Sequence, residues 1–368
     1  MQDERREAGV VRDAMEAEFG GTAVTGRPAG SEELRGWLLQ LKEQVEAHAL
    51  KLPPASQSFA SPPTDRERHA MQRDAFLHHL RSASLLPAKA GSVAKSGLPA
   101  HFVEFGAGNG ALSYAIWLAS RGVSSSFLVD QRKSLLLSLK EVQTEVPMPA
   151  DGVDWGVPAG QSPPSWEPLF VCADVTVMGS EFLRNTVPVG TCVGLANHLC
   201  GDALDCAIRA TVEAWPGGEN GTLSAFLAAT CCHHKISWDK FIGRSQFVAW
   251  GFGRDHFEQV RRWSRLAPRR SRESSTRARV VEEAELLGIS PAEAASLGVS
   301  CRILLDRARM NFLAKIGFET RLLHHVPFDA TADNVLLVAV APRRDTSVPS
   351  DAMSNGIFEE SDRELAPT

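Results

Sequence analysis

The sequence of 368 residues lacks the features that mark membrane-spanning and secreted proteins. Its longest apolar runs fall far short of the roughly 18 residues that a membrane-spanning helix needs. Its seven cysteines do not show the paired spacing of a disulfide scaffold, which favours reduced thiols. The N-terminal stretch has no apolar signal core and is too acidic for a typical transit peptide. We therefore expect a protein of the cytosol or nucleus that has no membrane partner.

A strong excess of one charge is also absent, because the formal net charge is only −5 at pH 7. Such a charge does not by itself indicate a nucleic-acid partner, although an average can hide a local patch. What the sequence does contain is apolar side chains, with 43% hydrophobic residues against 23% charged ones. This composition supports a sizeable folded core, as one large domain or one domain with extensions.

Short apolar segments alternate with helical segments through the middle of the chain, which predicts a mostly parallel, Rossmann-like α/β sheet. The expected strands are 102–105, 127–130, 169–173, 191–196 and 223–229, and the expected helices between them are 111–120, 134–145 and 202–215. A helix at 303–316 followed by strands at 319–326 and 335–341 suits a sheet with an antiparallel edge strand.

The same patterns divide the chain into four parts. We expect a disordered N-terminus at 1–30, a helical extension at 31–98, the α/β domain at 99–342 with an insertion at about 243–300, and a disordered tail at 343–368. The insertion is the part of the domain in which the alternation of strands and helices breaks.

The most specific local motif is a glycine loop, Glu104-Phe-Gly106-Ala-Gly108-Asn-Gly110, between an expected strand and an expected helix. Glycines at such a turn let the backbone approach a ligand closely and direct its N–H groups at it. Asp130 ends the next strand, where a carboxylate can accept both ribose hydroxyls of an adenosine. The predicted cofactor-binding residues are Glu104, Gly106, Ala107, Gly108, Gly110, Asp130, Asp174 beside the adenine, and Asn197.

Two cofactors fit this loop, and a loop without a ligand is the third alternative. Gly106, Gly108 and Ala111 meet the spacing of the dinucleotide fingerprint, with Asp130 at a suitable distance. S-adenosylmethionine fits as well, and Glu104 favours it, because this carboxylate can accept a hydrogen bond from the cationic methionine amine. We therefore expect S-adenosylmethionine as the cofactor.

Two polar sequences follow the fourth and fifth expected strands, at the edge of the sheet where ligands bind. One runs from Asn197 through His198 to Asp202, and the other is Cys231-Cys232-His233-His234. Buried strands rarely end in so many titratable groups unless these groups face a site. The alternatives are that Asn197 caps a turn and Asp202 a helix, that His198 is a structural histidine, and that Cys200 and Cys206 only fill space.

Zinc is the other chemistry that cysteine and histidine suggest for residues 231–234. Structural zinc usually takes its ligands from two spaced pairs. Four consecutive residues in an extended chain point to alternate sides, so that one ion cannot bind all four. We therefore predict no metal site here, and histidines that orient a substrate or accept a proton. The candidate catalytic residues are His198, Asp205, His233 and His234.

The segment from Arg254 to Arg279 is rich in arginine and poor in acidic residues. It predicts either an arm that contacts RNA phosphates or a solvated loop. Trp250, Phe252 and Trp263 are available there for packing or for stacking on bases. The predicted RNA-contacting residues are Arg261, Arg262, Arg265, Arg269 and Arg270 in this segment, with Arg309 beyond it.

These motifs, in this order, resemble the eukaryotic tRNA 2′-O-methyltransferase family that modifies the fourth nucleotide of the acceptor stem. The resemblance covers about residues 66–341 and rests on EFGAGNGALS (104–113), NHLCGDALDCAIR (197–209), CCHHKISWDKFIG (231–243), LLDRARMNFLAKIGF (304–318) and TADNVLLVA (331–339). It implies a class I methyltransferase sheet, S-adenosylmethionine as the cofactor and tRNA as the partner. The sequence departs from the family pattern before residue 100, where the usual zinc modules are missing, and in Lys235-Ile236, Ala308, Thr331 and Asp333.

The resemblance also implies a mechanism. A ribose 2′-hydroxyl attacks the sulfonium methyl in line, and the enzyme aligns the two groups and removes the hydroxyl proton. His198, oriented by Asp205, is the expected base, with His233 and His234 as rivals. Two other functions stay open at this point: a methyltransferase for a different RNA, protein or small molecule, and a non-catalytic RNA-binding member of the fold.

Overall fold

The computed structural model describes residues 31–53, 63–86, 100–132, 139–148, 162, 164–216, 221–268 and 274–342. The ends for which we predicted disorder, 1–30 and 343–368, lie outside these residues. In the part of the chain that is described, no helix is both long enough and apolar enough to cross a membrane.

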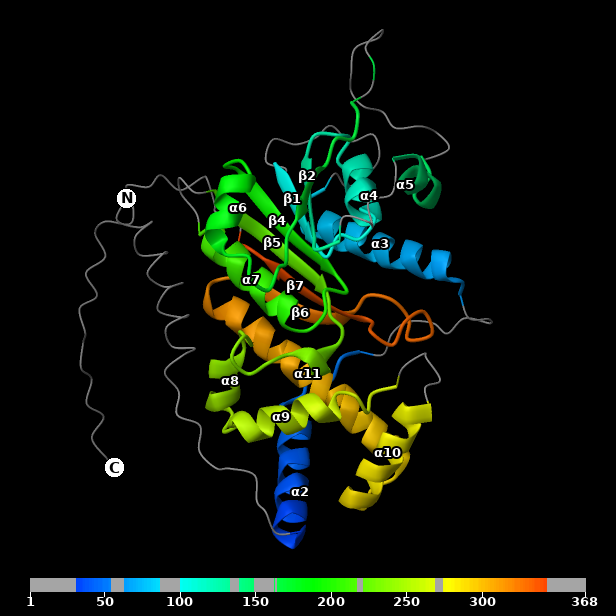
Figure 1. Cartoon of the computed structure of the whole chain (residues 1–368), viewed down its shortest axis with the longest axis vertical. Coiled ribbons are helices and arrows are strands. Elements are labelled where there is room, and N and C mark those ends of the chain that lie inside the picture. The colour runs from blue at the N-terminus through cyan, green and yellow to red at the C-terminus, as the bar shows by residue number, and fades with distance from the viewer. Residues whose placement is uncertain are drawn as a thin grey trace, which may run out of the picture.

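Seven strands form one mixed sheet in the order β3-β2-β1-β4-β5-β7-β6 (Figure 1). They are β1 (His101–Phe105), β2 (Ser125–Asp130), β3 (Leu169–Cys172), β4 (Thr191–Asn197), β5 (Thr222–Ala229), β6 (Glu319–His324) and β7 (Val335–Val340). β1 to β5 pair in parallel, whereas β7 is antiparallel to both β5 and β6. The predicted Rossmann-like α/β class is confirmed, with the antiparallel strand one place inside the edge because β6 takes the edge itself.

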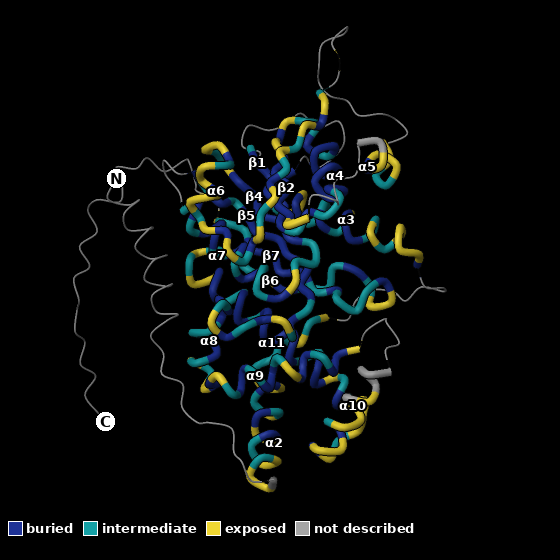
Figure 2. The backbone as a smooth tube through the Cα atoms, viewed as in Figure 1, coloured by how far each residue is buried: buried dark blue, intermediate teal, exposed yellow. Residues whose placement is uncertain are grey.

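Helices cover both faces of this sheet, which gives three layers (Figure 1). α6 (Ser180–Thr186), α7 (Asp202–Ala214) and the C-terminal part of α11 (Pro291–Lys315) lie on one face. α3 (Asp65–Ser82) and α4 (Ala111–Ala119) lie on the other, and α5 (Leu139–Glu145) packs against α4. Because both faces are covered, a central strand such as β1 is buried along its whole length (Figure 2).

A second core lies beside the sheet and is made mostly of helices. We call it the helical cluster; it consists of α2 (Ser31–His48), α8 (Arg244–Ala249), α9 (Arg254–Trp263), α10 (Ser274–Leu287) and the N-terminal part of α11. Buried aromatic side chains fill it, among them Phe247, Phe257 and Trp263. In its described part, the predicted insertion is therefore a packed helical structure and not a solvated loop.

α11 begins at Pro291, well before the start that we predicted at residue 303. The Ser290 hydroxyl accepts a hydrogen bond from the Glu293 N–H at 3.2 Å, and the Glu293 carboxylate accepts one from the Ser290 N–H at 2.8 Å. Proline suits the first helical position, because an N–H there would have no partner within the helix. The early start lets one helix reach from the helical cluster to the sheet.

The predicted helical extension at 31–98 contains two helices that pack in different places. α2 places Leu38 and Val45 in the helical cluster. α3 instead packs Phe76 and Leu80 into the core between α4 and the sheet. This position brings α3 to the loops that follow the central strands.

Candidate functional site

Four strands end at one edge of the sheet. Phe105 of β1 pairs with Val129 of β2 and with Ala196 of β4, and Asn197 of β4 pairs with Ala229 of β5. Because the strands are parallel, the loops that follow them meet at this edge. The glycine loop and both polar sequences therefore lie there together, as the sequence predicts.

The glycine loop leaves an open approach to the backbone at its centre. Gly106, Gly108 and Gly110 have φ angles of 68°, 55° and 78°, a region that favours glycine. A Cβ would lie 3.0 Å from Leu199 Cδ1 at Gly106 and 2.9 Å from Leu128 Cδ1 at Gly110, but it would meet nothing within 4 Å at Gly108. The side of the loop at Gly108 is therefore the one that a ligand can approach.

Asp130 is fixed beside this loop. Its side chain is buried, Oδ2 accepts a hydrogen bond from the Gly108 N–H at 3.0 Å, and Oδ1 accepts one from the Arg132 N–H at 2.9 Å. Each carboxylate oxygen has a second lone pair. The pair of oxygens is thus held in place and keeps the capacity to accept from ribose hydroxyls.

Glu104 is buried under the loop and turns toward α4. Its Oε2 accepts hydrogen bonds from the Ser113 N–H at 3.1 Å and from the Ser113 hydroxyl at 2.5 Å. Burial raises the pKa of Glu104 to about 7, against the lowering by Ser113 and with a smaller contribution from the charge of Asp130. Its predicted contact with a methionine amine stays a prediction.

Asn197 and Asp174 differ sharply in their surroundings. The Oδ1 atom of Asn197 is buried and has no hydrogen-bond partner, a costly state that a donor from a ligand would relieve. Asp174 is exposed, and its Oδ1 accepts from the N–H and the hydroxyl of Thr176 at 2.9 and 2.8 Å, which lowers the pKa of Asp174. Its place beside an adenine stays a prediction.

The loops after β4 and β5 pack closely against each other and are joined by hydrogen bonds. A Cβ at Gly201, whose φ is 61°, would lie 2.7 Å from Lys235 Cβ and 2.9 Å from the Lys235 carbonyl oxygen. The carboxylate of Asp202 accepts from the Ser237 N–H at 2.6 Å and from the Ser237 hydroxyl at 2.9 Å. Asp202 therefore links the two loops and does not cap α7, so the two polar sequences form one unit.

His198 stands at the centre of this unit, in a left-handed conformation with a φ of 61°. Its N–H donates to the Ala229 carbonyl at 3.1 Å, and its Nε2 lies 2.7 Å from Nε2 of Gln72, a buried residue of α3. As the amide is oriented, Gln72 donates to Nε2, so the imidazole proton is on Nδ1. Burial lowers the pKa of His198, against the raising effect of Asp333, which favours the neutral ring.

The structure corrects two predicted roles, because Asp205 and Arg309 are paired with each other. The guanidinium of Arg309 donates to Asp205 Oδ1 and Oδ2 at 3.1 and 2.5 Å, and to Asp306 Oδ1 at 2.9 Å. All three side chains are buried. Asp205 therefore does not orient His198, and Arg309, only 1% exposed, does not contact RNA.

His233 belongs to the same buried network. Its Nε2 lies 2.8 Å from Asp306 Oδ2, which also accepts from the Thr230 hydroxyl at 2.7 Å. Because a carboxylate only accepts, Nε2 carries a proton. Nδ1 of His233 is buried without a partner. His234 is half-buried, and its carbonyl oxygen accepts from Arg261 of α9 at 2.8 Å.

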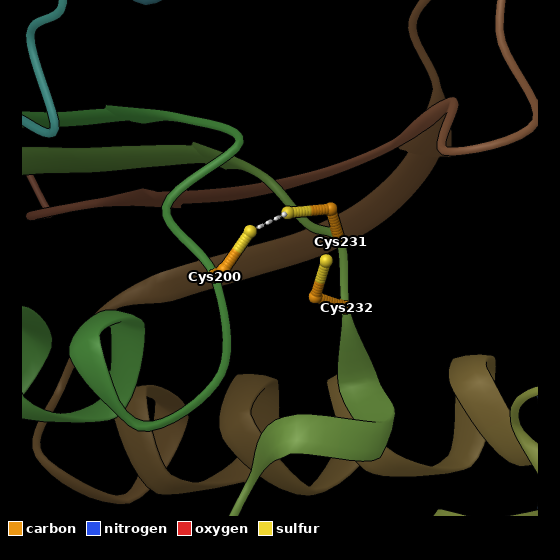
Figure 3. Close-up of side chains that lie close together, drawn as sticks. All are labelled: Cys200, Cys231 and Cys232. Carbon is orange, nitrogen blue, oxygen red and sulfur yellow. Dashed lines mark hydrogen bonds between the residues drawn. The ribbon is translucent and has the colours of Figure 1, made fainter.

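Three cysteines meet where the two loops touch. The Sγ atoms of Cys200 and Cys231 are 3.4 Å apart, and all three sulfurs, with that of Cys232, lie within 4.8 Å of one another (Figure 3). The extended chain that we expected at 231–234 is wrong: Cys232 is left-handed with a φ of 49°, and His233–Lys235 form a 3-10 helix. Adjacent cysteines can therefore both turn toward Cys200. Hydrogen bonds from Cys200 and Cys231 hold the pKa of Cys232 well below its usual range.

The arginines of residues 254–270 include paired, exposed and half-buried side chains. Arg261 pairs with Glu258 and contacts the His234 carbonyl, and Arg254 pairs with Asp239 at 3.1 Å on the surface. Arg262 is exposed, and Arg265 is half-buried. Arg269 and Arg270 lie outside the described residues.

The aromatic residues of this segment serve packing. Phe252 and Trp263 are buried in the helical cluster, and Trp263 Nε1 donates to Glu283 at 3.0 Å. Trp250 stacks on His48, with ring centroids 5.2 Å apart, and lies under the guanidinium of Arg307. Of the two alternatives that the sequence left open for these three, packing is the one that the structure supports.

The sequence of the loops and of α7 to β7 matches a known family. The model of the family described as methyltransferase TRM13 matches residues 174–340. The match begins at Asp174 and includes both polar sequences and the buried Asp205–Arg309 pair, whereas the glycine loop precedes it.

Curated relatives extend the TRM13 likeness toward the N-terminus. The chain is 23% identical over 287 residues to the tRNA:m(4)X modification enzyme TRM13 of Schizosaccharomyces pombe, covering 74% of this chain and 68% of that protein. It is 24% identical to the TRM13 homolog of Mus musculus, over 81% of this chain and 74% of that protein. The Homo sapiens homolog is also 24% identical, over 65% and 59%.

The comparison with solved structures gives methyltransferases of low sequence identity and low TM-score. The SAH-bound Podospora anserina methyltransferase PaMTH1 gives a TM-score of 0.34 at 9% identity, covering 91% of this chain and 96% of that chain. The plantazolicin methyltransferase BpumL in complex with SAH gives a TM-score of 0.28 at 11% identity, covering 85% and 99%.

Proposed function

We propose that this protein is an S-adenosylmethionine-dependent methyltransferase that methylates a ribose 2′-hydroxyl in the acceptor stem of tRNA. The observation that carries the proposal is that β4 ends in Asn197 and His198 directly beside the glycine loop that follows β1. The methyltransferase family and the names of the relatives, which are tRNA modification enzymes, support the substrate class.

Three features at this edge fit S-adenosylmethionine. Gly108 borders open space, Asp130 holds two carboxylate oxygens beside it, and Asn197 Oδ1 is a buried acceptor without a donor. We assign the ribose hydroxyls to Asp130 and a polar N–H or O–H of the bound molecules to Asn197. S-adenosylmethionine, when bound, supplies an electrophilic methyl group on a sulfonium.

We assign the proton of the 2′-hydroxyl to His198. Gln72 holds the tautomer in which Nε2 carries the lone pair, and burial favours the neutral ring. A base needs both conditions before it can accept a proton. The 2′-hydroxyl competes with the Gln72 amide for this lone pair. His233 is less suited, because its side chain is buried and bound to Asp306.

The RNA is assigned to the side of the site that faces α9. Arg261 ties α9 to the loop after β5 through the His234 carbonyl, so that α9 lies next to the edge of the sheet. Arg254 and Arg262 are exposed on α9. Guanidinium groups at such positions attract phosphates and position an RNA helix without reading its sequence.

The test is methylation of tRNA with a labelled methyl donor. Purified protein is incubated with total tRNA, and the labelled tRNA is digested to nucleosides, in which a 2′-O-methyl nucleoside is expected. A synthetic tRNA with a 2′-deoxynucleotide at the fourth acceptor-stem position serves as the control and is expected to stay unlabelled. Label on a base, label on the deoxy control, or no label on any tRNA would overturn the proposal.

A further inference from the structure

The three cysteines that join the loops after β4 and β5 come from separate parts of the sequence. Cys200 follows β4, while Cys231 and Cys232 follow β5, and their sulfurs lie within 4.8 Å of one another. In Figure 3 the side chains of Cys200 and Cys231 point toward each other, and that of Cys232 points toward the same space. Cysteines that merely fill space do not need to converge in this way.

The spacing of the sulfurs is that of a metal–thiolate site. With zinc–sulfur bonds of about 2.3 Å in a tetrahedron, two thiolates bound to one zinc ion lie roughly 3.8 Å apart. The observed Cys200–Cys231 separation of 3.4 Å lies just below this value. The upper limit of 4.8 Å on all three sulfur–sulfur separations lies above it. Only small movements of the side chains are needed for all three sulfurs to bind one ion.

The backbone of the two loops has one uncommon conformation and one unusually close approach. Cys232 has a φ of 49°, which is uncommon for a residue with a Cβ. Gly201 approaches Lys235 so closely that a Cβ at Gly201 would lie 2.7 Å from Lys235 Cβ. These two features are observed independently of the sulfur distances, and both lie in the loops that carry the three cysteines.

We propose that Cys200, Cys231 and Cys232 bind one zinc ion through three thiolates, which links the loop after β4 to the loop after β5. Thiolates select zinc among the common divalent ions. In the described part of the chain, no fourth His, Cys, Asp or Glu belongs to the group. The fourth position is therefore taken by solvent, which has access from the side of the exposed Cys200. The single negative charge of such a site is offset by the nearby ammonium of Lys235.

The position of the ion defines its role. Cys200 is two residues from His198, and its Sγ lies 3.6 Å from the His198 carbonyl oxygen. An ion at the three sulfurs fixes the left-handed turn at His198 against the loop that carries His233. We infer a positioning role, in which the ion holds the candidate base without touching the reacting atoms.

Metal content is the direct test and does not depend on activity. The full chain is purified without chelator and its zinc is measured by mass spectrometry, with about one ion per chain expected. Chelator-treated protein is then titrated with Co²⁺, for which thiolate-to-cobalt absorption in the near ultraviolet is expected. Cys200→Ser is the main variant, because its exposed side chain is replaced without loss of core packing. Cys231→Ser and Cys232→Ser are expected to lose zinc in the same way.

Cys206→Ser is the matched control. Cys206 is half-buried on α7, with its Sγ 3.8 Å from the Thr176 carbonyl, and is outside the group of three. It is expected to keep its zinc, whereas folded Cys200→Ser loses at least 90% of it, with folding checked by circular dichroism. A folded parent protein that neither contains zinc nor binds Co²⁺ would overturn the proposal. A Cys200–Cys231 disulfide as the stable state in reductant-free purification would also overturn it.

Discussion

Gln72 Nε2 lies 2.7 Å from His198 Nε2, although 126 residues separate the two in the sequence. Gln72 is buried on α3, which precedes the α/β domain and packs against α4. The helix before the domain is thus a part of the site. We expect its main contribution to be the tautomer and the orientation of the His198 ring.

Replacing Gln72 tests this contribution. Gln72→Leu removes the amide and frees the His198 ring to rotate, and we expect single-turnover methylation of tRNA to fall about 100-fold. Cofactor affinity is expected to stay unchanged, because the hydrogen bond of the Gln72 amide is to His198. Asp74→Asn, an exposed change on the same helix, is the control. If Gln72→Leu transfers methyl groups at the parent rate, the contact has no role in catalysis.

The choice of base is tested by histidine replacements under single-turnover conditions. His198→Ala is expected to fold, bind both substrates and lose roughly 100- to 10,000-fold in turnover, the usual contribution of a general base. His234→Ala is expected to keep most of its activity. An inactive but folded His234→Ala beside an active His198→Ala would place the base in the loop after β5.

The buried Asp205–Arg309 pair makes a prediction about stability. Arg309→Leu leaves the Asp205 carboxylate buried without its guanidinium and leaves Asp306 only Thr230 and His233 as partners. We expect this change to lower the free energy of unfolding by about 3–5 kcal/mol. Urea unfolding followed by tryptophan fluorescence measures the change. Arg262→Leu is the control, because this arginine is exposed and its loss is expected to change stability by less than about 0.5 kcal/mol. Equal stability of the two variants would contradict the importance of the pair.

The cofactor assignment is tested at two residues of different kinds. Gly108→Arg fills the open side of the loop and forces a side chain into a left-handed conformation, and Asp130→Ala removes the acceptor for ribose hydroxyls. Calorimetric titration is expected to show at least a 100-fold loss of S-adenosylmethionine affinity in each. The Asp130→Ala protein must keep a native circular dichroism spectrum. Parent-like affinity in that folded variant removes our placement of the adenosine.

Glu104 predicts a pH dependence of cofactor binding. Burial raises its pKa to about 7, so the neutral form prevails below this pH and the carboxylate above it. In the cofactor-free protein, the stability contributed by neutral Glu104 is complete below pH 4.5 and is lost as the pH rises through about 7. A cationic methionine amine favours the carboxylate, so S-adenosylmethionine affinity is expected to increase from pH 6 to pH 8. The affinity of Glu104→Gln is expected to stay constant over the same pH range. An equal pH dependence in both proteins would show that a group other than Glu104 causes it.

Sequence patterns predicted the sheet well because its strands are short apolar runs between turn signals. The bounds of β1, β4 and β5 fall within one residue of the predicted ones. The glycine loop and the polar strand ends could also be located, since parallel strands place the loops that follow them at one edge. These features depend on local sequence and on one rule of topology.

The contacts that define the site could not be predicted, because they join distant residues. Arginine is almost never fully buried unless it is paired, and nothing near Arg309 in the sequence reveals that Asp205 lies against it. Cys200 is likewise far from Cys231, and an extended chain was the natural expectation for residues 231–234. The left-handed turn at Cys232 is a consequence of the packing between loops, which local patterns do not encode.

α11 is unbroken over 25 residues, a length of about 37 Å at 1.5 Å per residue. Its first turns pack in the helical cluster, and its last turns lie against β6. Between them, Asp306 binds His233 in the loop after β5, and Arg309 binds Asp205 of α7. One continuous helix therefore joins the helical cluster to the sheet. In the proposed function, this helix sets the span from the arginines of α9 to His198. If those arginines hold RNA phosphates, the nucleotide that is methylated is selected by its distance from them and not by its base.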